Sequence, residues 1–204
     1  MQTLIRRWGV VSLLFLWAQV SPAHGASAQE PLAVTLAAEK EVGPLPAGPL
    51  FWQVEDFPTL ALAEAAAGPT SLVLAIDGGR GLVFTLGRLG ASKHRGRTVA
   101  EIGPVPPMIA PAYLLQAYRV GGPPGAAIPV HAHLGSEAFY VLAGRMGQRT
   151  SRGSRHAAAG QSMAGYGAEP PAEVFNSGPT GLSAVLLRLV PLGRSSAPVT
   201  SERR

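Results

Sequence analysis

Short runs of apolar and β-branched residues alternate with turns rich in Gly and Pro along most of the chain beyond residue 50. Many short strands, with a turn signal after about every ten residues, are typical of a β-sandwich or a β-barrel. No internal repeat is visible, which indicates one barrel rather than two. The runs that predict strands are Ser71–Ile76, Gly81–Leu86, Thr98–Ile102, Ala112–Val120, Ala127–His133, Ala138–Leu142, Arg145–Thr150, Glu173–Asn176 and Leu182–Val190.

Two of the turns between these runs are readable from their residues. Asp77-Gly78-Gly79 and Arg152-Gly153-Ser154 each suit a tight hairpin, because Gly adopts the backbone angles that such turns require. Ala61–Ala67 is a short helical possibility, which Gly68-Pro69 closes. The pattern therefore predicts an all-β domain with little helix.

The remaining segments set the expected domain boundaries. Residues 29–50 are Pro-rich and irregular, and they predict an arm that packs on the sheet or on a neighbouring subunit. We expect residues 51–192 to form a single barrel, with its core motif in 112–190. Residues 193–204 are polar and predict a flexible tail.

Residues 1–28 have the pattern of a secretory signal peptide. Arg6 and Arg7 supply a positive start, an uncharged apolar run of about 13 residues begins at Trp8, and Ala26–Ala28 offers small residues for cleavage near Ala28. The alternative is a membrane anchor, but a spanning helix needs about 20 apolar residues. We therefore expect a periplasmic or secreted protein with no stable membrane span after cleavage.

Composition agrees with a packed, exported domain. The chain is 47% hydrophobic and 14% charged, so it can bury a core. It has no Cys, so packing, alone or with a bound metal, must stabilise it without disulfides. The net charge of +5 falls to +3 when Arg6 and Arg7 are removed with the leader. No basic stripe on a helix accompanies the scattered arginines, so we expect no nucleic-acid partner.

The residues that suggest chemistry lie between Gly125 and Gly144. His131 and His133 are two residues apart, so on a strand both imidazoles point to the same face. Glu137 follows a short connection, and at the start of the next strand it can face the same interior point. Two imidazoles and one carboxylate are ligands for Fe, Mn, Zn, Ni or Cu, and three protein ligands leave positions open for a small molecule.

These residues resemble, position for position, the first motif of the cupin superfamily. Gly125, His131, His133, Glu137 and Gly144 have the spacing of that motif. The resemblance covers about residues 112–190. It implies a double-stranded β-helix, that is, a jelly-roll barrel, with His131, His133 and Glu137 as metal ligands. It also implies a homodimer.

The second cupin motif is matched only in part. Gly160 fits its opening glycine and Asn176-Ser177-Gly178 fits its end. The family usually has a Pro-x-Gly turn between them, where Tyr166 and Ala168 stand here, and a third histidine, where Pro171 or Ala172 stands here. With one imidazole fewer than the usual cupin site, we expect the metal to be bound more weakly.

Five further residues are candidates for the lining of the pocket. Phe139 and Val141 alternate with Tyr140 along the strand, so they share the face of Glu137. Tyr113, Met146 and Met163 are added as pocket candidates, although plain core packing explains each of them too. His156 follows Arg155 near a turn and is expected at the surface.

Three functions remain open at this point. The first is an exported metal-binding cupin domain that binds or senses a small molecule in the barrel. The second is a metal-dependent enzyme that acts on a small polar substrate, either as a dioxygenase or as an isomerase-like enzyme. The third is a structural protein in which the barrel is only a scaffold, because one barrel fold serves many functions.

Overall fold

The computed structural model describes residues 30–90, 95–106, 108–132, 135–165 and 170–192. They form thirteen strands, one α-helix and a short 3₁₀ turn. The strands are β1 Ala33–Val42, β2 Leu50–Phe57, β3 Ser71–Ala75, β4 Gly81–Gly87, β5 Arg97–Val105, β6 Tyr113–Gly122, β7 Ala127–His131, β8 Ser136–Ala143, β9 Arg145–Thr150, β10 Gly153–Ala158, β11 Ser162–Ala164, β12 Ala172–Asn176 and β13 Leu182–Pro191.

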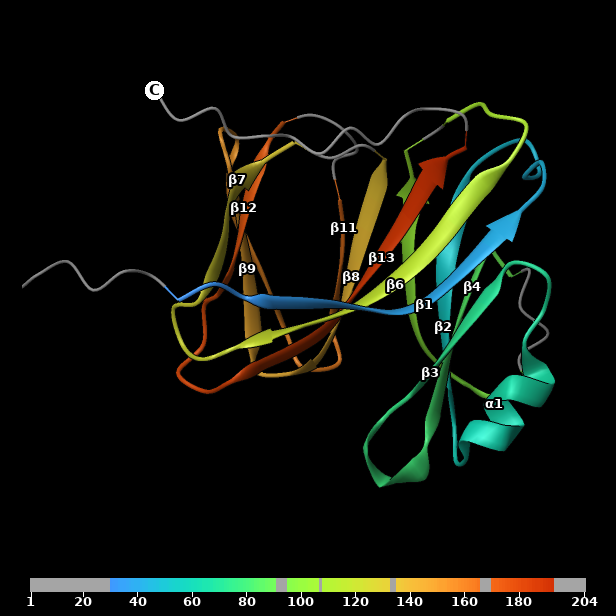
Figure 1. The fold of residues 1–204 in the computed structure, drawn as a ribbon, viewed down its shortest axis with the longest axis horizontal. Helices are drawn as coiled ribbons and strands as arrows, with labels where there is room; N and C mark the ends of the chain where they lie inside the picture. The colour runs from blue at the N-terminus through green and yellow to red at the C-terminus, as the bar shows by residue number, and fades with distance from the viewer. Residues whose placement is uncertain (1–29, 91–94, 107, 133–134, 166–169, 193–204) are drawn as a thin grey trace, which may run out of the picture.

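The last eight strands form a jelly roll. Four of them have the order β6-β13-β8-β11 in one sheet, and the other four have the order β10-β9-β12-β7 in the facing sheet. Successive strands alternate between the two sheets except at the β9–β10 hairpin, which is the connection of a double Greek key. The expectation of a single jelly-roll barrel is thus confirmed by strand order (Figure 1).

A third sheet, with the order β3-β4-β2-β5, packs on the outer face of the first. Strand β1 joins the edge of the first sheet by pairing with β6, which makes that sheet five-stranded and places it in the middle of the molecule (Figure 1). The expected boundaries put residues 51–192 in one barrel. The structure instead has the jelly roll in residues 113–191, with residues 50–105 in the additional sheet.

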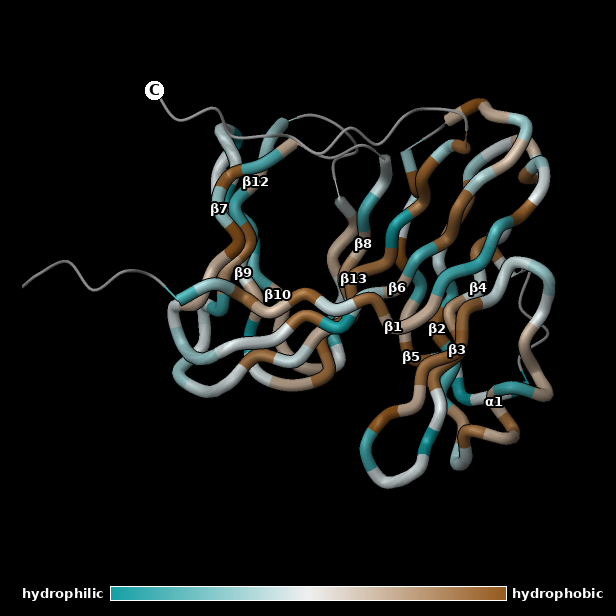
Figure 2. Tube along the Cα trace, viewed as in Figure 1, coloured by the Kyte–Doolittle hydropathy of each residue, from teal (hydrophilic) through white to brown (hydrophobic). Residues whose placement is uncertain are grey.

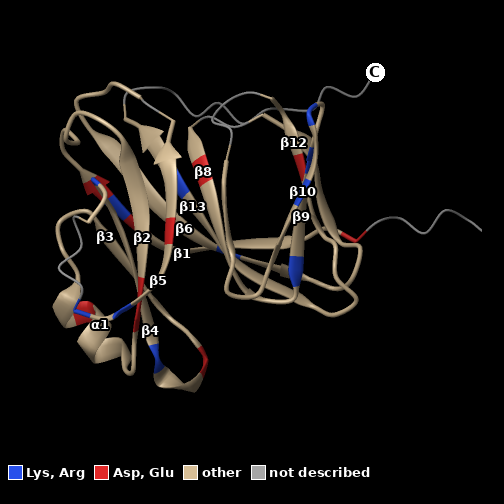
Figure 3. Ribbon diagram, turned by 180° about the vertical axis from the view of Figure 1, so that it is seen from behind, with Lys and Arg blue, Asp and Glu red and all other residues tan. Residues whose placement is uncertain are grey.

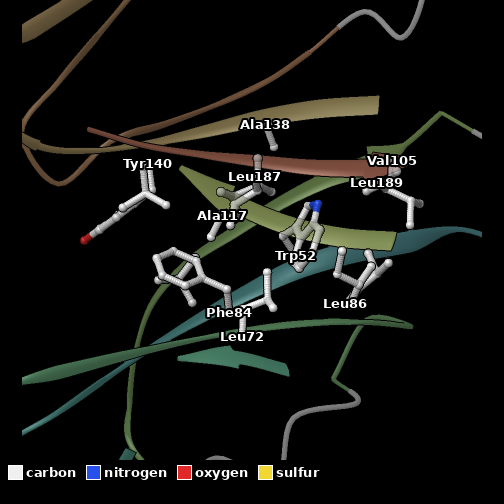
Figure 4. Close-up of a cluster of buried hydrophobic side chains, with 14 of the residues drawn as sticks. Trp52, Leu72, Phe84, Leu86, Val105, Ala117, Ala138, Tyr140, Leu187 and Leu189 are labelled. Carbon is white, nitrogen blue, oxygen red and sulfur yellow. The ribbon is translucent and has the colours of Figure 1, made fainter. Parts of the chain in front are cut away.

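The middle sheet is buried on both faces. Side chains alternate along each strand, so residues with odd and even numbers (the two parities) point to opposite faces. On β6, β8 and β13 the residues of one parity face the third sheet and surround Trp52 and Phe84, as Figure 4 shows. Residues of the other parity face the jelly-roll interior, where Phe139 and Leu186 pack. This double burial explains the nearly continuous apolar run of β13, and hydrophobic positions recur along strands in all three sheets (Figure 2).

The short local elements agree with the sequence. Helix α1, Leu60–Ala66, begins at Thr59, whose hydroxyl accepts a hydrogen bond from the N–H of Leu62, and it packs on the third sheet through Ala63. The β3–β4 turn contains Gly78 and Gly79, both with positive φ. The β9–β10 hairpin lies where Arg152-Gly153-Ser154 predicts it. The predicted helix and both predicted hairpins are therefore confirmed.

Four strands were not expected from the sequence pattern. Strands β1, β2, β10 and β11 have no counterpart among the predicted runs, and β1 lies within residues 29–50, the segment expected to be irregular. β1 is mostly exposed on both of its faces, so its sequence shows no clear apolar alternation. Its strand structure comes from backbone pairing with β6, which only the tertiary arrangement supplies.

No helix among the described residues has the length and apolarity needed to span a bilayer. The expected leader, residues 1–28, and the expected tail, residues 193–204, lie outside the described residues.

Candidate functional site

The first motif occupies strands β7 and β8, which belong to facing sheets of the jelly roll. The motif begins at Gly125 and ends at Gly144, and both glycines have positive φ, 79° and 76° respectively. A side chain at either position would strain the turn, which accounts for Gly at both ends of the motif. The motif thus brings side chains of two facing sheets toward one interior.

His131 faces this interior because of a β-bulge. Ala172 pairs with His131, and Val174 pairs with Ile128, so β7 has one extra residue between the two pairs. Paired residues on antiparallel strands point to the same face, and Val174 lies in the jelly-roll core. The bulge therefore directs both Ile128 and His131 inward.

The ring of His131 is held by its own strand. Its Nδ1 lies 2.7 Å from the carbonyl oxygen of Pro129. A neutral imidazole that donates Nδ1–H to this carbonyl carries its lone pair on Nε2. Metal-binding histidines commonly have such a backbone partner, because it sets both the tautomer and the ring orientation.

Glu137 enters the same interior from β8. It shares its face with Phe139 and Val141, which are both buried in the jelly-roll core. Its side chain is only 7% exposed, and its Oε1 lies 3.2 Å from Nε of Arg188 on β13. Arg188 and Glu137 are paired in register, and Figure 3 shows the acidic position on β8 beside the basic one on β13.

Arg188 is a site residue that the sequence reasoning missed. It is the one charged residue in the apolar run of β13, and it shares the parity of Leu186, which faces the jelly-roll interior. An isolated charge within a strand that is otherwise apolar is the signal that would have found it. Its guanidinium carbon also lies 5.8 Å from the ring centroid of Tyr118.

The Arg188–Glu137 pair changes the electrostatic argument for the metal. A buried carboxylate needs a compensating charge, and the sequence reasoning assigned that role to a metal or a histidine cation. In the structure a guanidinium takes this role, with its side chain 24% exposed. A metal bound to Glu137 would therefore lie near a positive charge, which weakens its binding.

The proposed ligand set is described only in part. His131 and Glu137 both face the jelly-roll interior, whereas His133 lies outside the described residues. Within the part of the chain that the structure describes, no three His, Asp or Glu side chains lie close enough together to hold a metal ion. The nitrogen and oxygen donors that are described fit a divalent transition metal by their chemistry.

The second motif is clearer at its end than at its centre. Ala172, rather than Pro171, is the residue paired with His131, so a fully buried methyl group stands where cupins usually place the third histidine. Asn176 donates from its side-chain amide to the carbonyls of Gly122 and Thr180, which ties the turn after β12 to β6. Tyr166 and Ala168 lie outside the described residues.

Four of the five pocket candidates meet in the jelly-roll core. Phe139, Val141, Met146 and Met163 are all buried in one cluster. Tyr113 does not join them, because it has the other parity on β6 and faces the third sheet, where its hydroxyl donates to the carbonyl of Met108.

A second arginine extends across the jelly-roll interior. The guanidinium of Arg155 on β10 donates to Oε1 of Gln148 at 2.6 Å and to the carbonyl of Ala164 at 2.9 Å. Gln148 is buried and is paired with Val174, which faces the jelly-roll interior. Arg155 is paired with Gln148 on the other side, so Gln148 and Arg155 both face inward. Arg155 is half-buried, whereas its neighbour His156 is exposed, as expected. The interior thus holds two guanidinium groups and one carboxylate among the residues described.

No family model matches the chain, and no curated protein matches it. Several solved cupin structures are similar to part of it. A sugar phosphate isomerase from Silicibacter pomeroyi DSS-3, from a cupin superfamily, is 18% identical over 36% of this chain and 48% of its own, with a TM-score of 0.32. The similarity thus spans about half of the length of that isomerase.

Two smaller proteins are covered more fully. A cupin domain from Bordetella pertussis Tohama I is 18% identical over 42% of this chain and 88% of its own, with a TM-score of 0.32. A cupin family protein with a double-stranded β-helix fold from Methanocaldococcus jannaschii is 14% identical over 38% of this chain and 70% of its own, with a TM-score of 0.34. At such scores the jelly-roll assignment rests on the strand order, and nothing about activity follows from these neighbours.

Proposed function

We propose that this cupin-like jelly-roll domain binds a small molecule in its interior, with a divalent transition metal held there by His131, His133 and Glu137. The observation that carries the proposal is that a bulge on β7 turns His131 toward the same interior that Glu137 enters from the facing sheet. When bound, a metal would supply a Lewis acid that holds an oxygen atom of the ligand.

The residues of the chain have separate roles in this proposal. The carbonyl of Pro129 orients the ring of His131, so that Nε2 is the nitrogen that binds. Arg188 orients the carboxylate of Glu137 and adds positive charge beside it. Together with Arg155, it favours a polar ligand with negative character over an apolar one.

Metal analysis of the purified protein tests the proposal. We expect stoichiometric metal in the native protein and its loss in His131→Ala and Glu137→Ala. The matched control is His156→Ala, because His156 is an exposed imidazole on β10, in the same sheet as His131, and it contacts Ser177 and not the proposed site. Equal metal content in all four proteins would contradict the proposed ligand set.

Arg188 provides a second, sharper test of the same site. Because its guanidinium repels a cation at Glu137, Arg188→Met should tighten metal binding by about tenfold or less, measured by competition with a chelator. Weaker binding in Arg188→Met would mean that the arginine supports the metal site instead of competing with it.

The export and assembly of the protein are further proposals. We propose that cleavage near Ala28 yields a periplasmic or secreted protein, which the mass of the protein recovered from the producing cell would test. We also propose a homodimer, in which the exposed edge strand β1, with Val34 and Leu36 at its surface, contacts the partner. A monomer mass by light scattering would contradict it.

Turnover is the alternative to simple binding. The open coordination positions of a three-ligand site favour a dioxygenase or isomerase-like activity as readily as a sensor. Oxygen uptake by the metal-loaded protein with a panel of metabolites would reveal a dioxygenase, and conversion of a metabolite to an isomer without oxygen uptake would reveal an isomerase. Binding without either change would indicate a sensor.

A further inference from the structure

A cavity lies on the opposite face of the middle sheet from His131 and Glu137. It has a volume of about 320 Å³ and opens where the third sheet and the middle sheet part, next to the β3–β4 turn. This volume is at the lower end of the range of about 300–1,000 Å³ that is usual for ligand pockets. Strand β8 carries side chains of both sites, with Glu137 on one face and Tyr140 on the other.

The walls of the cavity are rich in arginine. Arg80, Arg97 and Arg119 line it together with Asp56 and Asp77, which leaves a net charge of +1. Arg80 directly precedes β4, Arg97 begins β5 and Arg119 lies near the end of β6, so residues distant in sequence converge on one space. Such convergence of one charge type on a concave surface favours a ligand of opposite charge.

Asp56 holds two of these arginines in place. Its Oδ2 accepts hydrogen bonds from Nη2 of Arg80 at 2.5 Å and from Nη2 of Arg97 at 2.7 Å, and its Oδ1 accepts one from Nε of Arg80 at 3.2 Å. The Asp56 side chain is 8% exposed, whereas those of Arg80 and Arg97 are 46% and 72% exposed. The carboxylate therefore anchors both guanidinium groups at the cavity wall, while both arginine side chains stay accessible to a ligand.

Arg119 and Tyr140 complete the polar lining. The guanidinium of Arg119 donates to the carbonyl of Ala75, which fixes it over β3. Figure 4 shows the hydroxyl of Tyr140 directed away from the apolar cluster around Trp52. Burial and the neighbouring carboxylate of Asp56 raise the pKa of Tyr140, so its hydroxyl stays protonated and can donate a hydrogen bond.

We propose that this cavity binds a small organic anion, with a carboxylate or phosphate head among Arg80, Arg97 and Arg119. Guanidinium groups match both kinds of head, because their paired N–H donors suit paired oxygens. The apolar part of the ligand lies against Leu82 and Val99, which line the same cavity. The site is independent of the metal proposed for the jelly-roll interior.

Calorimetric titration of the full chain tests this proposal. The probes are benzoate and phenyl phosphate, with benzamide as the neutral analogue of benzoate and inorganic phosphate as a head without an apolar part. We expect one benzoate or phenyl phosphate per chain, and binding of benzamide weaker by about tenfold, because a hydrogen bond to a charged group contributes about 1.5 kcal/mol or more. Whichever of the two anions binds more tightly identifies the head.

Two variants link binding to the cavity. Arg119→Gln should weaken anion binding by about tenfold, and because Arg119 is exposed the variant should fold. Tyr140→Phe removes only the hydroxyl and should weaken binding less. The matched control is Arg149→Gln on the far sheet, where Arg149 pairs with Glu173, and it should bind as the native protein does.

The proposal fails if neither anion binds, or if benzamide binds as tightly as benzoate. It also fails if Arg119→Gln and Tyr140→Phe both bind the anion as tightly as Arg149→Gln does.

Discussion

Glu137 and Asp56 are both buried acids, and each is compensated by arginine rather than left for a ligand to neutralise. Glu137 has Arg188 on the neighbouring strand, and Asp56 has Arg80 and Arg97. Their settings nevertheless differ. Glu137 lies on the interior face of the jelly roll beside His131, whereas Asp56 anchors the floor of an open cavity. The first suits metal binding weakened by a nearby cation, and the second suits anion binding.

Asp56 makes the stability of the protein depend on pH in the acid range. Burial alone would raise its pKa, but the hydrogen bonds and charges of Arg80 and Arg97 outweigh burial and lower it. A carboxyl whose folded pKa is lowered stabilises the native state above its unfolded pKa of about 3.9, and this contribution is lost as pH falls through the folded pKa.

We therefore expect the free energy of unfolding to fall between about pH 5 and pH 2 in the native protein, and to fall less in Asp56→Asn. Urea unfolding at several pH values measures it. Asp77→Asn is the control, since Asp77 is an exposed acid at the same cavity, and it should follow the native profile. Parallel pH profiles for Asp56→Asn and the native protein would show that the ion pairs of Asp56 do not contribute to the free energy of unfolding.

Elements β8 and β13 explain how one chain builds two sites back to back. Along β8 the residues Glu137, Phe139 and Val141 face the jelly-roll interior, while Ala138 and Tyr140 face the third sheet. Because side chains alternate along a strand, a shift of the pairing by one residue would exchange the two faces. The register of β8 against β13 thus determines both sites together.

The turn that ends the first motif allows a test at the level of the element. A Cβ atom on Gly144 would lie 2.4 Å from the carbonyl oxygen of Gly181, and the residue has φ 76°. Gly160 has nearly the same φ, 79°, but nothing lies within 4 Å of its Cβ position. We expect Gly144→Ala to destabilise the protein by at least about 1 kcal/mol more than Gly160→Ala, as measured by urea unfolding. Equal losses of unfolding free energy in the two variants would contradict this expectation. They would mean that the positive φ alone causes the loss, and that the turn shifts enough to relieve the contact with Gly181.

At the scale of the whole molecule, the middle sheet joins two apolar cores. One core lies between it and the third sheet, and the other lies within the jelly roll. Neither core can remain intact if β6, β8 and β13 separate, because those strands contribute to both. The arrangement predicts that the jelly roll and the third sheet unfold as one cooperative unit.

Trp52 provides a probe for this prediction. It is fully buried between the third sheet and the middle sheet, and the other two tryptophans lie in the expected leader. In a chain that begins at residue 29, the transitions by tryptophan fluorescence and by far-ultraviolet circular dichroism should coincide in urea. A fluorescence transition at lower urea than the dichroism transition would show that the third sheet detaches first.

The positions of nine strands, the helix, two hairpins and the first motif could be predicted from the sequence, because alternation, Gly turns and motif spacing are local properties. Strand β1 could not, since its backbone is ordered by pairing with β6, some 80 residues away in the chain. The third sheet could not be told apart from the barrel for a different reason. Its strands β3, β4 and β5 were predicted as strands, but strands of a jelly roll and strands of a covering sheet have similar local patterns.

The sequence by itself determined an all-β chain with His131 and Glu137 on consecutive strands of a cupin-like motif. Only the tertiary structure decided which cation Glu137 meets, which face Tyr113 and Arg155 take, and that three arginines converge on one cavity. Those outcomes depend on the pairing of β13 with both β6 and β8 and on the packing of the third sheet. Contacts between residues so far apart follow from the free energy of the whole packed molecule, which no local pattern encodes.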